Sequence, residues 1–302
     1  MDSDLWIPLT VLAAFSQNVR SALQKHLTTR LSTVGATQAR FLYAAPFAIL
    51  YVAILHYAAG YGLPSLNRSF LIYATAGALA QIVAAALLVA LFSHRNFFVG
   101  TAFSKTETLQ AAVLGLLILA DELSLGALVG ICIGVAGVVA IAAAKNRPGG
   151  DGIIRSLKSE ATVIGFLVGL LFGIAAICFR GASLSLGGGF LIQAAVTLVF
   201  VLVLQTVVVT AYLWRQEPGQ MTAVLNNWRI SWLVGLAGMV ASVGWFSAMT
   251  LQNASYVRAL GQVELVFAFL ASTIVFGERT TKLEFGGVAL VVAGILVLLV
   301  FR

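Results

Sequence analysis

Charged residues are scarce in this chain. Only 10% of its 302 residues are Asp, Glu, Lys or Arg, and 60% are hydrophobic. An ordinary soluble domain carries about 25% charged residues. A chain of this composition cannot cover a water-facing surface of the size that its length demands, which excludes most classes of soluble enzyme. The sequence therefore predicts a membrane protein.

Several chemical motifs are also missing. The chain has two cysteines, both inside apolar runs, which argues against a disulfide framework. It has no Gly-x4-Gly-Lys-Ser/Thr loop that would use ATP directly. Its three histidines are scattered without metal-ligand spacing, so we expect no cofactor and no metal site. The net charge of +7 is spread thinly between apolar runs, so we expect no nucleic-acid partner, and the lipid bilayer as surroundings.

The apolar residues fall into runs long enough to cross a bilayer, which takes roughly 20 residues. Ten such runs are predicted as helices, at residues 5–27, 34–56, 70–92, 98–119, 124–144, 161–183, 187–213, 230–250, 257–276 and 283–301. The connections between them are too short for a soluble domain. The predicted fold is an all-α membrane protein of ten transmembrane helices.

The longest polar stretch, residues 145–160, divides the chain into residues 1–144 and 161–302, each with five runs. The halves share residues at one constant offset of 157: Asn96 matches Asn253, Ala102 Ala259, Glu107 Glu264, Gly130 Gly287, Gly137 Gly294, and Asp121 matches Glu278. Because each half has an odd number of spans, the second half must be inserted upside down. Inverted five-helix repeats of this kind recur in secondary transporters.

The second repeat resembles the EamA repeat of the drug/metabolite transporter superfamily. The resemblance runs from Ala254 to Val300, with Gly277-Glu278 before a last helix that carries Gly287 and Ala293-Gly294, and Val99 to Ala144 resembles the same repeat. It implies a ten-helix carrier of small metabolites, with both termini in the cytoplasm. The chain departs from the family where many members have proline in helices 4 and 9 and it has Thr108 and Leu265.

The distribution of basic residues predicts the opposite orientation. Loops after the odd-numbered helices hold eleven Lys and Arg, whereas the face with both termini holds three, Arg68, Arg180 and Arg302. Cytoplasmic loops carry the excess of Lys and Arg, which puts both termini outside the cytoplasm. We take this count as the prediction, because it is a property of this chain.

Ionisable residues lie deep in helices 4 and 9. Lys105 and Glu107 are about 12–15 Å from the end of their run at helical rise, and Gln262 and Glu264 are at the equivalent depth from the opposite face. A charge near the bilayer centre costs about 2.5–3.5 kcal/mol and usually faces the protein interior. One interpretation is that these residues line a wet central chamber and bind cargo or exchange protons. The other is that Glu107 pairs with Lys105, or Glu264 with Arg258, as structural ties. Since positions two apart point to different faces, Lys105 and Glu107 are expected to serve different neighbours.

Other candidate site residues lie on helices 1 and 8. Gln17, Arg20 and Gln24 share one stripe of helix 1, and Arg20 is either a bidentate ligand of an acidic cargo group or an internal or interfacial charge. Trp245 lies deep in helix 8, where it either stacks on a planar cargo or packs between helices. Arg40, near the start of helix 2, is expected to reach the interface.

Two further features concern packing. Glycines at four-residue spacing in helices 5 and 6 (Gly126, Gly130, Gly134, and Gly165, Gly169, Gly173) predict close helix contacts within a monomer or weak homodimer. Tryptophans near predicted helix ends (Trp6, Trp214, Trp228 and Trp232) are expected to lie in the interfacial belt.

Together these observations predict a multi-pass protein of the cell (inner or plasma) membrane that is a secondary transporter, not an enzyme. Its expected cargo is a small polar metabolite such as an amino acid, with protons as a candidate coupling ion. The candidate residues are Glu107, Glu264, Lys105, Arg20, Gln17, Gln262 and Trp245. The alternative is a membrane-embedded enzyme that uses Glu107 and Glu264 as acid and base on a lipid-soluble substrate.

Overall fold

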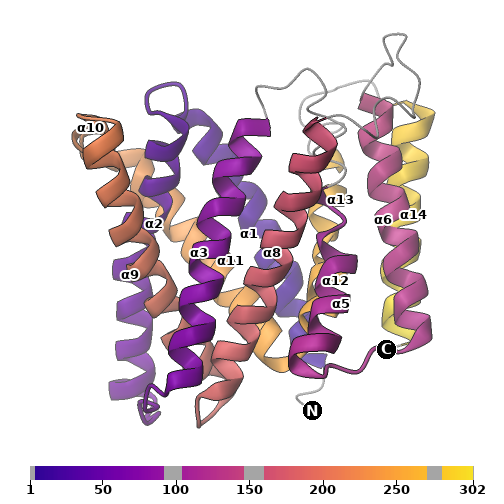
Figure 1. Ribbon diagram of the computed structural model, residues 1–302, viewed down its shortest axis with the longest axis horizontal. Coiled ribbons are helices and arrows are strands. Elements are labelled where there is room, and N and C mark those ends of the chain that lie inside the picture. The colour runs from indigo at the N-terminus through magenta and orange to yellow at the C-terminus, as the bar shows by residue number, and fades with distance from the viewer. Residues whose placement is uncertain (1–3, 92–103, 146–159, 271–280, 302) are drawn as a thin grey trace. The chain divides into compact units, whose positions relative to one another are not determined.

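The computed structural model describes residues 4–91, 104–145, 160–270 and 281–301, and every regular element in these ranges is a helix (Figure 1). The helices are α1 (Trp6–Leu27), α2 (Thr33–Ala53), the π-helical η2 (Ile54–Ala58), α3 (Arg68–Leu91), α5 (Glu107–Leu119), α6 (Leu125–Lys145), α8 (Glu160–Ser185), α9 (Phe190–Gln216), α10 (Gln220–Asn226), α11 (Trp228–Leu251), α12 (Ala254–Gly261), α13 (Val263–Leu270) and α14 (Lys282–Val300). This confirms the all-α prediction.

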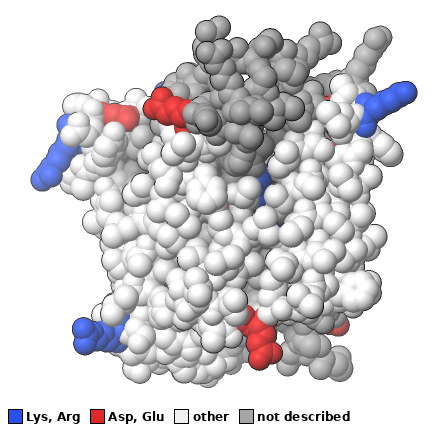
Figure 2. All heavy atoms as spheres, turned by 45° about the vertical axis from the view of Figure 1, so that its right-hand side comes forward, with Lys and Arg blue, Asp and Glu red and all other residues white. Residues whose placement is uncertain are grey.

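Six stretches of the described chain are long and apolar enough to cross a membrane. They are Thr33–Ala58, Arg68–Leu88, Thr162–Ser185, Phe190–Gln216, Trp228–Leu251 and Lys282–Val300. Figure 2 shows few charged side chains on the face in view, and large apolar side chains such as Leu117 and Val207 are exposed. Several helices thus have the length and surface of membrane spans, which is consistent with a multi-pass protein.

The chain folds into two compact units. The first unit comprises Met1–Leu79 with Cys178–Gln252, and the second comprises Ala80–Ile177 with Asn253–Arg302. Each unit therefore takes segments from both halves of the sequence, and α3 and α8 contribute to both. Most of the predicted linker, residues 146–159, lies outside the described residues, as does the Gly277-Glu278 pair.

Two pairs of helix starts have the same 157-residue spacing as the matching residues of the sequence. Thr33 and Phe190, the first residues of α2 and α9, are 157 positions apart, as are Leu125 and Lys282, the first residues of α6 and α14. Helices related by this offset belong to the same unit: α2 and α9 to the first, α6 and α14 to the second.

Glycines bring α6 and α14 together in the second unit. A Cβ added to Gly130 would lie 2.7 Å from the backbone nitrogen of Leu298, and one added to Gly137 would lie 2.6 Å from the carbonyl oxygen of Gly287. Because higher numbers on α6 meet lower numbers on α14, the two helices are antiparallel (Figure 1). The predicted glycine seam of helix 5 is therefore confirmed as helix packing.

The first unit packs α1, α2 and α9 against α11. The Arg180 guanidinium ties the end of α11 to α8, because its Nη1 donates to the carbonyl oxygens of Met249 and Gln252, both at 2.7 Å. Trp214 and Trp228 are exposed, as expected for interfacial residues, but Trp6 is completely buried. The expectation of an interfacial Trp6 was therefore wrong, since its ring forms part of the core.

Candidate functional site

Helical structure is interrupted beside the predicted site residues in both halves of the chain. Lys105 and Thr106 form a turn just before α5, and Gln262 is the single non-helical residue between α12 and α13. The backbone at Gln262 has the tighter i to i−3 hydrogen bonds, from Gln262 N to Ala259 O (3.2 Å) and from Leu265 N to Gln262 O (2.9 Å). Lys105 and Gln262 are also exact mates in the repeat, and neither break requires the proline that many family members have.

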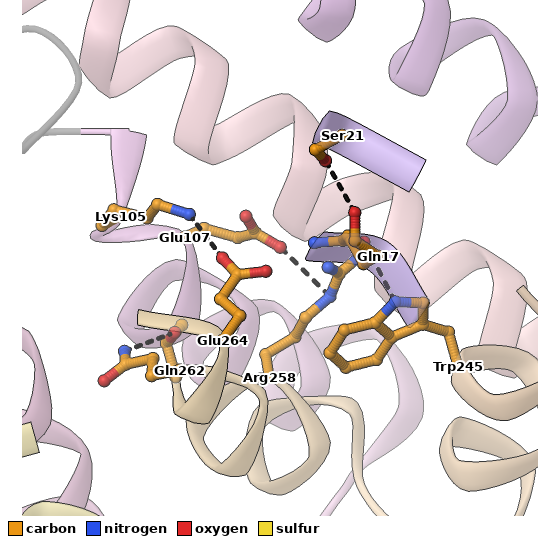
Figure 3. Close-up of polar contacts among 9 residues, drawn as sticks. Gln17, Ser21, Lys105, Glu107, Trp245, Arg258, Gln262 and Glu264 are labelled. Carbon is orange, nitrogen blue, oxygen red and sulfur yellow. Dashed lines mark hydrogen bonds and ion pairs between the residues drawn. The ribbon is translucent and has the colours of Figure 1, made fainter. Parts of the chain in front are cut away.

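Four charged residues of the second unit meet at these breaks. Lys105 Nζ lies 2.9 Å from Oε1 of Glu264, and Nε of Arg258 lies 3.1 Å from Oε1 of Glu107 (Figure 3). Lys105 also lies within electrostatic range of Glu107 and Arg258. We call these four residues the charge quartet, and its formal charge is zero.

The pairs of the charge quartet are crossed between the two halves. The alternative interpretation from the sequence paired Glu107 with Lys105, or Glu264 with Arg258. In the structure each glutamate forms an ion pair with a base from the other half. The expectation that Lys105 and Glu107 serve different neighbours is confirmed. The helix break between them directs the lysine to α13 and the glutamate to α12.

The four side chains of the charge quartet are partly exposed. The side chain of Lys105 is 34% exposed, those of Glu264 and Arg258 are both 18% exposed, and that of Glu107 is 15% exposed. Charges that are taken out of water require partners, which explains why the pairs form. The remaining exposure means that neither pair is fully enclosed within the unit.

Gly169 of α8 determines how closely that helix approaches the turn at Lys105. A Cβ at this position would lie 2.9 Å from the carbonyl oxygen of Ser104 and 3.2 Å from the backbone nitrogen of Glu107. Both contacts are to backbone atoms, which cannot move without moving the turn. The predicted glycine seam of helix 6 is therefore real here, and it supports the segment that carries two of the four charges.

The side-chain amide of Gln262 forms a hydrogen bond within the second unit. Its Nε2 donates to Oγ1 of Thr108 at 3.2 Å, and only 7% of the residue is exposed. A Cβ at Gly134 of α6 would lie 2.7 Å from Gln262 Oε1. Gln262 thus ties the break to α5 and lies against α6, beside the charge quartet.

The other predicted site residues belong to the first unit. Trp245 Nε1 donates to Oε1 of Gln17 at 3.1 Å, which links α11 to α1 (Figure 3). Arg20 lies against Gly238 of α11, together with Arg40 of α2. These contacts place Gln17, Arg20 and Trp245 within the first unit.

Sequence reasoning missed two participants. From the sequence, Arg258 was expected to be an anchor or a partner of Glu264. Its repeat mate is Thr101, so the repeat gave no reason to connect Arg258 with Glu107. Thr108 was noted only as a position where many family members have proline. Its hydroxyl oxygen accepts a hydrogen bond from the side-chain amide of Gln262. Among the described residues, no group of three or more His, Cys, Asp or Glu could hold a metal ion.

Comparison with known proteins adds independent evidence. Residues 159–300 match the EamA-like transporter family. Residues 159–300 form an EamA-like transporter domain. The chain is also 29% identical over 105 residues, 35% of its length, to an uncharacterized transporter in the cobO 3′ region of a Sinorhizobium species, covering 72% of that protein.

The fold of the chain is also found in a solved structure. One solved crystal structure resembles the chain with a TM-score of 0.74 at 16% sequence identity, over 99% of this chain and 98% of the other. The EamA-like family is a family of membrane transporters and not of enzymes. The alternative of a membrane-embedded enzyme is therefore not supported, and the expected family resemblance is confirmed.

Proposed function

We propose that this EamA-like protein is a secondary transporter that moves small polar metabolites, such as amino acids, by alternating access. In this proposal its ten transmembrane helices form two inverted five-helix repeats, residues 1–144 and 161–302, joined by the linker 145–160. The 157-residue spacing of the helix starts supports the repeat. Inverted repeats suit alternating access because the two halves can exchange conformations.

The observation that carries the proposal is the charge quartet at two helix breaks. Broken helices and ionisable side chains inside a membrane are both costly, and they mark transport sites in many carriers. Here the two features coincide at repeat-related positions, Lys105 and Gln262. A purely structural bundle would gain nothing from four charges that two apolar pairs could replace.

The charge quartet is suited to a zwitterionic cargo. With the cargo absent, each carboxylate is neutralised by a base, which lowers the cost of keeping it away from water. An arriving ammonium group would compete for Glu264 or Glu107, and an arriving carboxylate would compete for Lys105. Exchange of partners would then couple cargo binding to rearrangement of α12 and α13, and a proton could replace the ammonium on either glutamate.

The remaining features follow from the same proposal. The protein would lie in the inner or plasma membrane, and would act as a monomer or weak homodimer. Gln262 would hold the helix break in place through Thr108. Gln17, Arg20 and Trp245 stay candidate site residues of the first unit, and the wet chamber predicted from the sequence stays a prediction.

Uptake into liposomes tests the proposal. Purified full-length protein should take up one or more components of a mixture of radiolabelled amino acids in a saturable manner, and Glu107→Gln or Glu264→Gln should lower that rate about tenfold or more. Glu284→Gln is the matched control, because Glu284 is a partly exposed residue that caps α14 and lies outside the charge quartet. Wild-type rate and pH dependence in both site variants would refute the assignment of the site.

A further inference from the structure

Four exposed basic residues of the first unit lie where its helices end or begin. Lys25 is in the last turn of α1, and Arg30 follows in the turn that leads to α2. Arg215 is in the last turn of α9, and Arg229 is the second residue of α11. All four side chains are exposed. We call these four residues the basic end of the first unit.

Hydrogen bonds join the segments that carry the basic end. Nη1 of Arg30 donates to Oδ1 of Asn227 at 3.4 Å, which connects the turn between α1 and α2 to the start of α11. The hydroxyl of Ser32 in the same turn donates to Oε2 of Glu217, which directly follows α9. The end of α1, the end of α9 and the start of α11 therefore meet at one end of the first unit.

An apolar cluster packs the same segments against one another. Leu27 of α1, Leu31 of the turn, Ala36 of α2, Val224 of α10 and Val234 of α11 are all buried in it. Burial of apolar side chains from five segments holds their backbones together. The basic end is therefore carried by packed structure, and its four charges do not depend on a loose loop for their position.

The basic end has an excess of positive charge. Its four bases and the carboxylate of Glu217 give a formal charge of +3 among the described residues of this region. None of the four bases forms an ion pair within the described chain. The partners that the structure gives to the guanidinium groups are neutral: the amide of Asn227 for Arg30, and the ring of Trp228, 5.7 Å from Cζ, for Arg229.

The basic end lies where membrane spans meet the headgroup layer. The candidate span Phe190–Gln216 ends here, and the spans Thr33–Ala58 and Trp228–Leu251 begin here. Trp214 and Trp228 are 71% and 54% exposed. Exposed indole rings prefer the level of the lipid headgroups. The spans and the two rings thus place the four bases beside lipid phosphates.

We propose that the basic end is a binding surface for anionic phospholipids, with Arg30 and Arg229 as its main contacts to headgroup phosphates. Guanidinium groups bind phosphate oxygens through paired, charge-assisted hydrogen bonds. Clusters of Lys and Arg next to a membrane span are attracted to an anionic leaflet. The exposed tryptophans favour a lipid over a soluble polyanion, because they belong at the same depth as the headgroups. This binding does not require any particular cargo.

Native mass spectrometry of the full-length protein, released from nanodiscs of mixed phosphatidylcholine and phosphatidylglycerol, tests the surface. The wild-type protein should retain phosphatidylglycerol in preference to phosphatidylcholine. Arg30→Gln and Arg229→Gln should each lower this preference about threefold to fivefold. Arg68→Gln is the matched control, because it removes an exposed base at the start of α3, at the opposite end of the first unit, and it should keep the preference. No preference in the wild-type protein, or an equal loss in Arg68→Gln, would overturn the proposal.

A measurement on the wild-type protein guards against variants that fail to fold. Its unfolding temperature should be about 3 °C higher in phosphatidylglycerol nanodiscs than in phosphatidylcholine nanodiscs. Sodium chloride should reduce this difference, because salt screens charges at an exposed surface. Arg68→Gln should show the same difference as the wild-type protein. A difference that does not respond to sodium chloride would overturn an electrostatic contact with the headgroups.

A last arm tests soluble polyanions as the occupant. Polyglutamate and a single-stranded oligonucleotide are added to the protein in phosphatidylcholine nanodiscs. Weak binding of both, with a preserved preference for phosphatidylglycerol, supports the lipid. Saturable binding of either polymer through Arg30 and Arg229, without a preference for phosphatidylglycerol, would overturn it. Failure of amino-acid uptake in liposomes would refute the proposed function and leave the lipid preference unchanged.

Discussion

Glu107, the first residue of α5, pairs with Arg258 of α12 at 3.1 Å, although Lys105 is only two positions away in the chain. The partner of Lys105 is Glu264. Crossed pairing of this kind connects segments from the two halves of the sequence within one compact unit. Any movement that separates the segment from Lys105 to Glu107 from α12 or α13 must therefore break or exchange ion pairs.

Neutralising one member of an ion pair should cost more stability than removing both. Glu264→Gln leaves the Lys105 ammonium without its carboxylate. The double variant Lys105→Met with Glu264→Met removes both charges of this pair and leaves the pair of Arg258 and Glu107 in place. Because the pair is only partly exposed, the single variant should lose about 1–3 kcal/mol of unfolding free energy. The double variant should recover at least half of that loss and still fail to transport. The free energy of unfolding of both variants is measured in nanodiscs. Equal losses of unfolding free energy in the two variants would contradict the pairing.

The contact between α6 and α14 predicts a strong effect at one glycine and none at another on the same helix. A Cβ on Gly294 would lie 2.5 Å from the backbone nitrogen of Gly134, whereas one on Gly286 would meet nothing within 4 Å. Gly294→Ala should therefore destabilise the protein by about 1–3 kcal/mol through overpacking. Gly286→Ala should be neutral or slightly stabilising, as expected for alanine in a helix. Equal unfolding temperatures of the two variants would contradict the close contact between α6 and α14.

The hydrogen bond between Trp245 and Gln17 should be measurable by a double-mutant cycle. Trp245→Phe removes the indole N–H, and Gln17→Leu removes its acceptor. Each should cost about 0.5–1.5 kcal/mol, and the double variant should cost less than their sum. Strict additivity would show that the bond contributes nothing. Trp245→Leu removes the aromatic ring, so normal uptake by that variant would favour helix packing over cargo stacking as the role of the ring.

The two predictions of orientation can be separated by a reporter. The excess of Lys and Arg on one set of loops puts the C-terminus outside the cytoplasm, whereas the family resemblance implies a cytoplasmic C-terminus. A phosphatase fused after Arg302 is active only outside, and a fluorescent protein fused there is fluorescent only inside. We expect the phosphatase fusion to be active, and a fluorescent, phosphatase-inactive pair would reverse the assignment.

Much of the site was predictable from spacing alone. Glu107 and Glu264 stood out because they share an offset and lie deep in apolar runs, and both belong to the charge quartet. The pairing could not be predicted in the same way. Arg258 had no matching residue in the first half, and Arg40 was expected to reach the interface, although its stem lies beside Gly238 with that of Arg20.

The amino-acid sequence by itself determined that this protein belongs in a membrane, that its elements are helices, and that its halves share residues at one constant offset. These properties depend on apolar surface and helical periodicity, which add up along the chain and can be counted without knowing which residues are neighbours. The tertiary structure alone decided that Arg258 pairs with Glu107, where the helices break, and that the aliphatic stems of Arg20 and Arg40 meet at Gly238. Ion pairs and close backbone contacts act over a few ångströms, so they depend on which helix faces meet after folding.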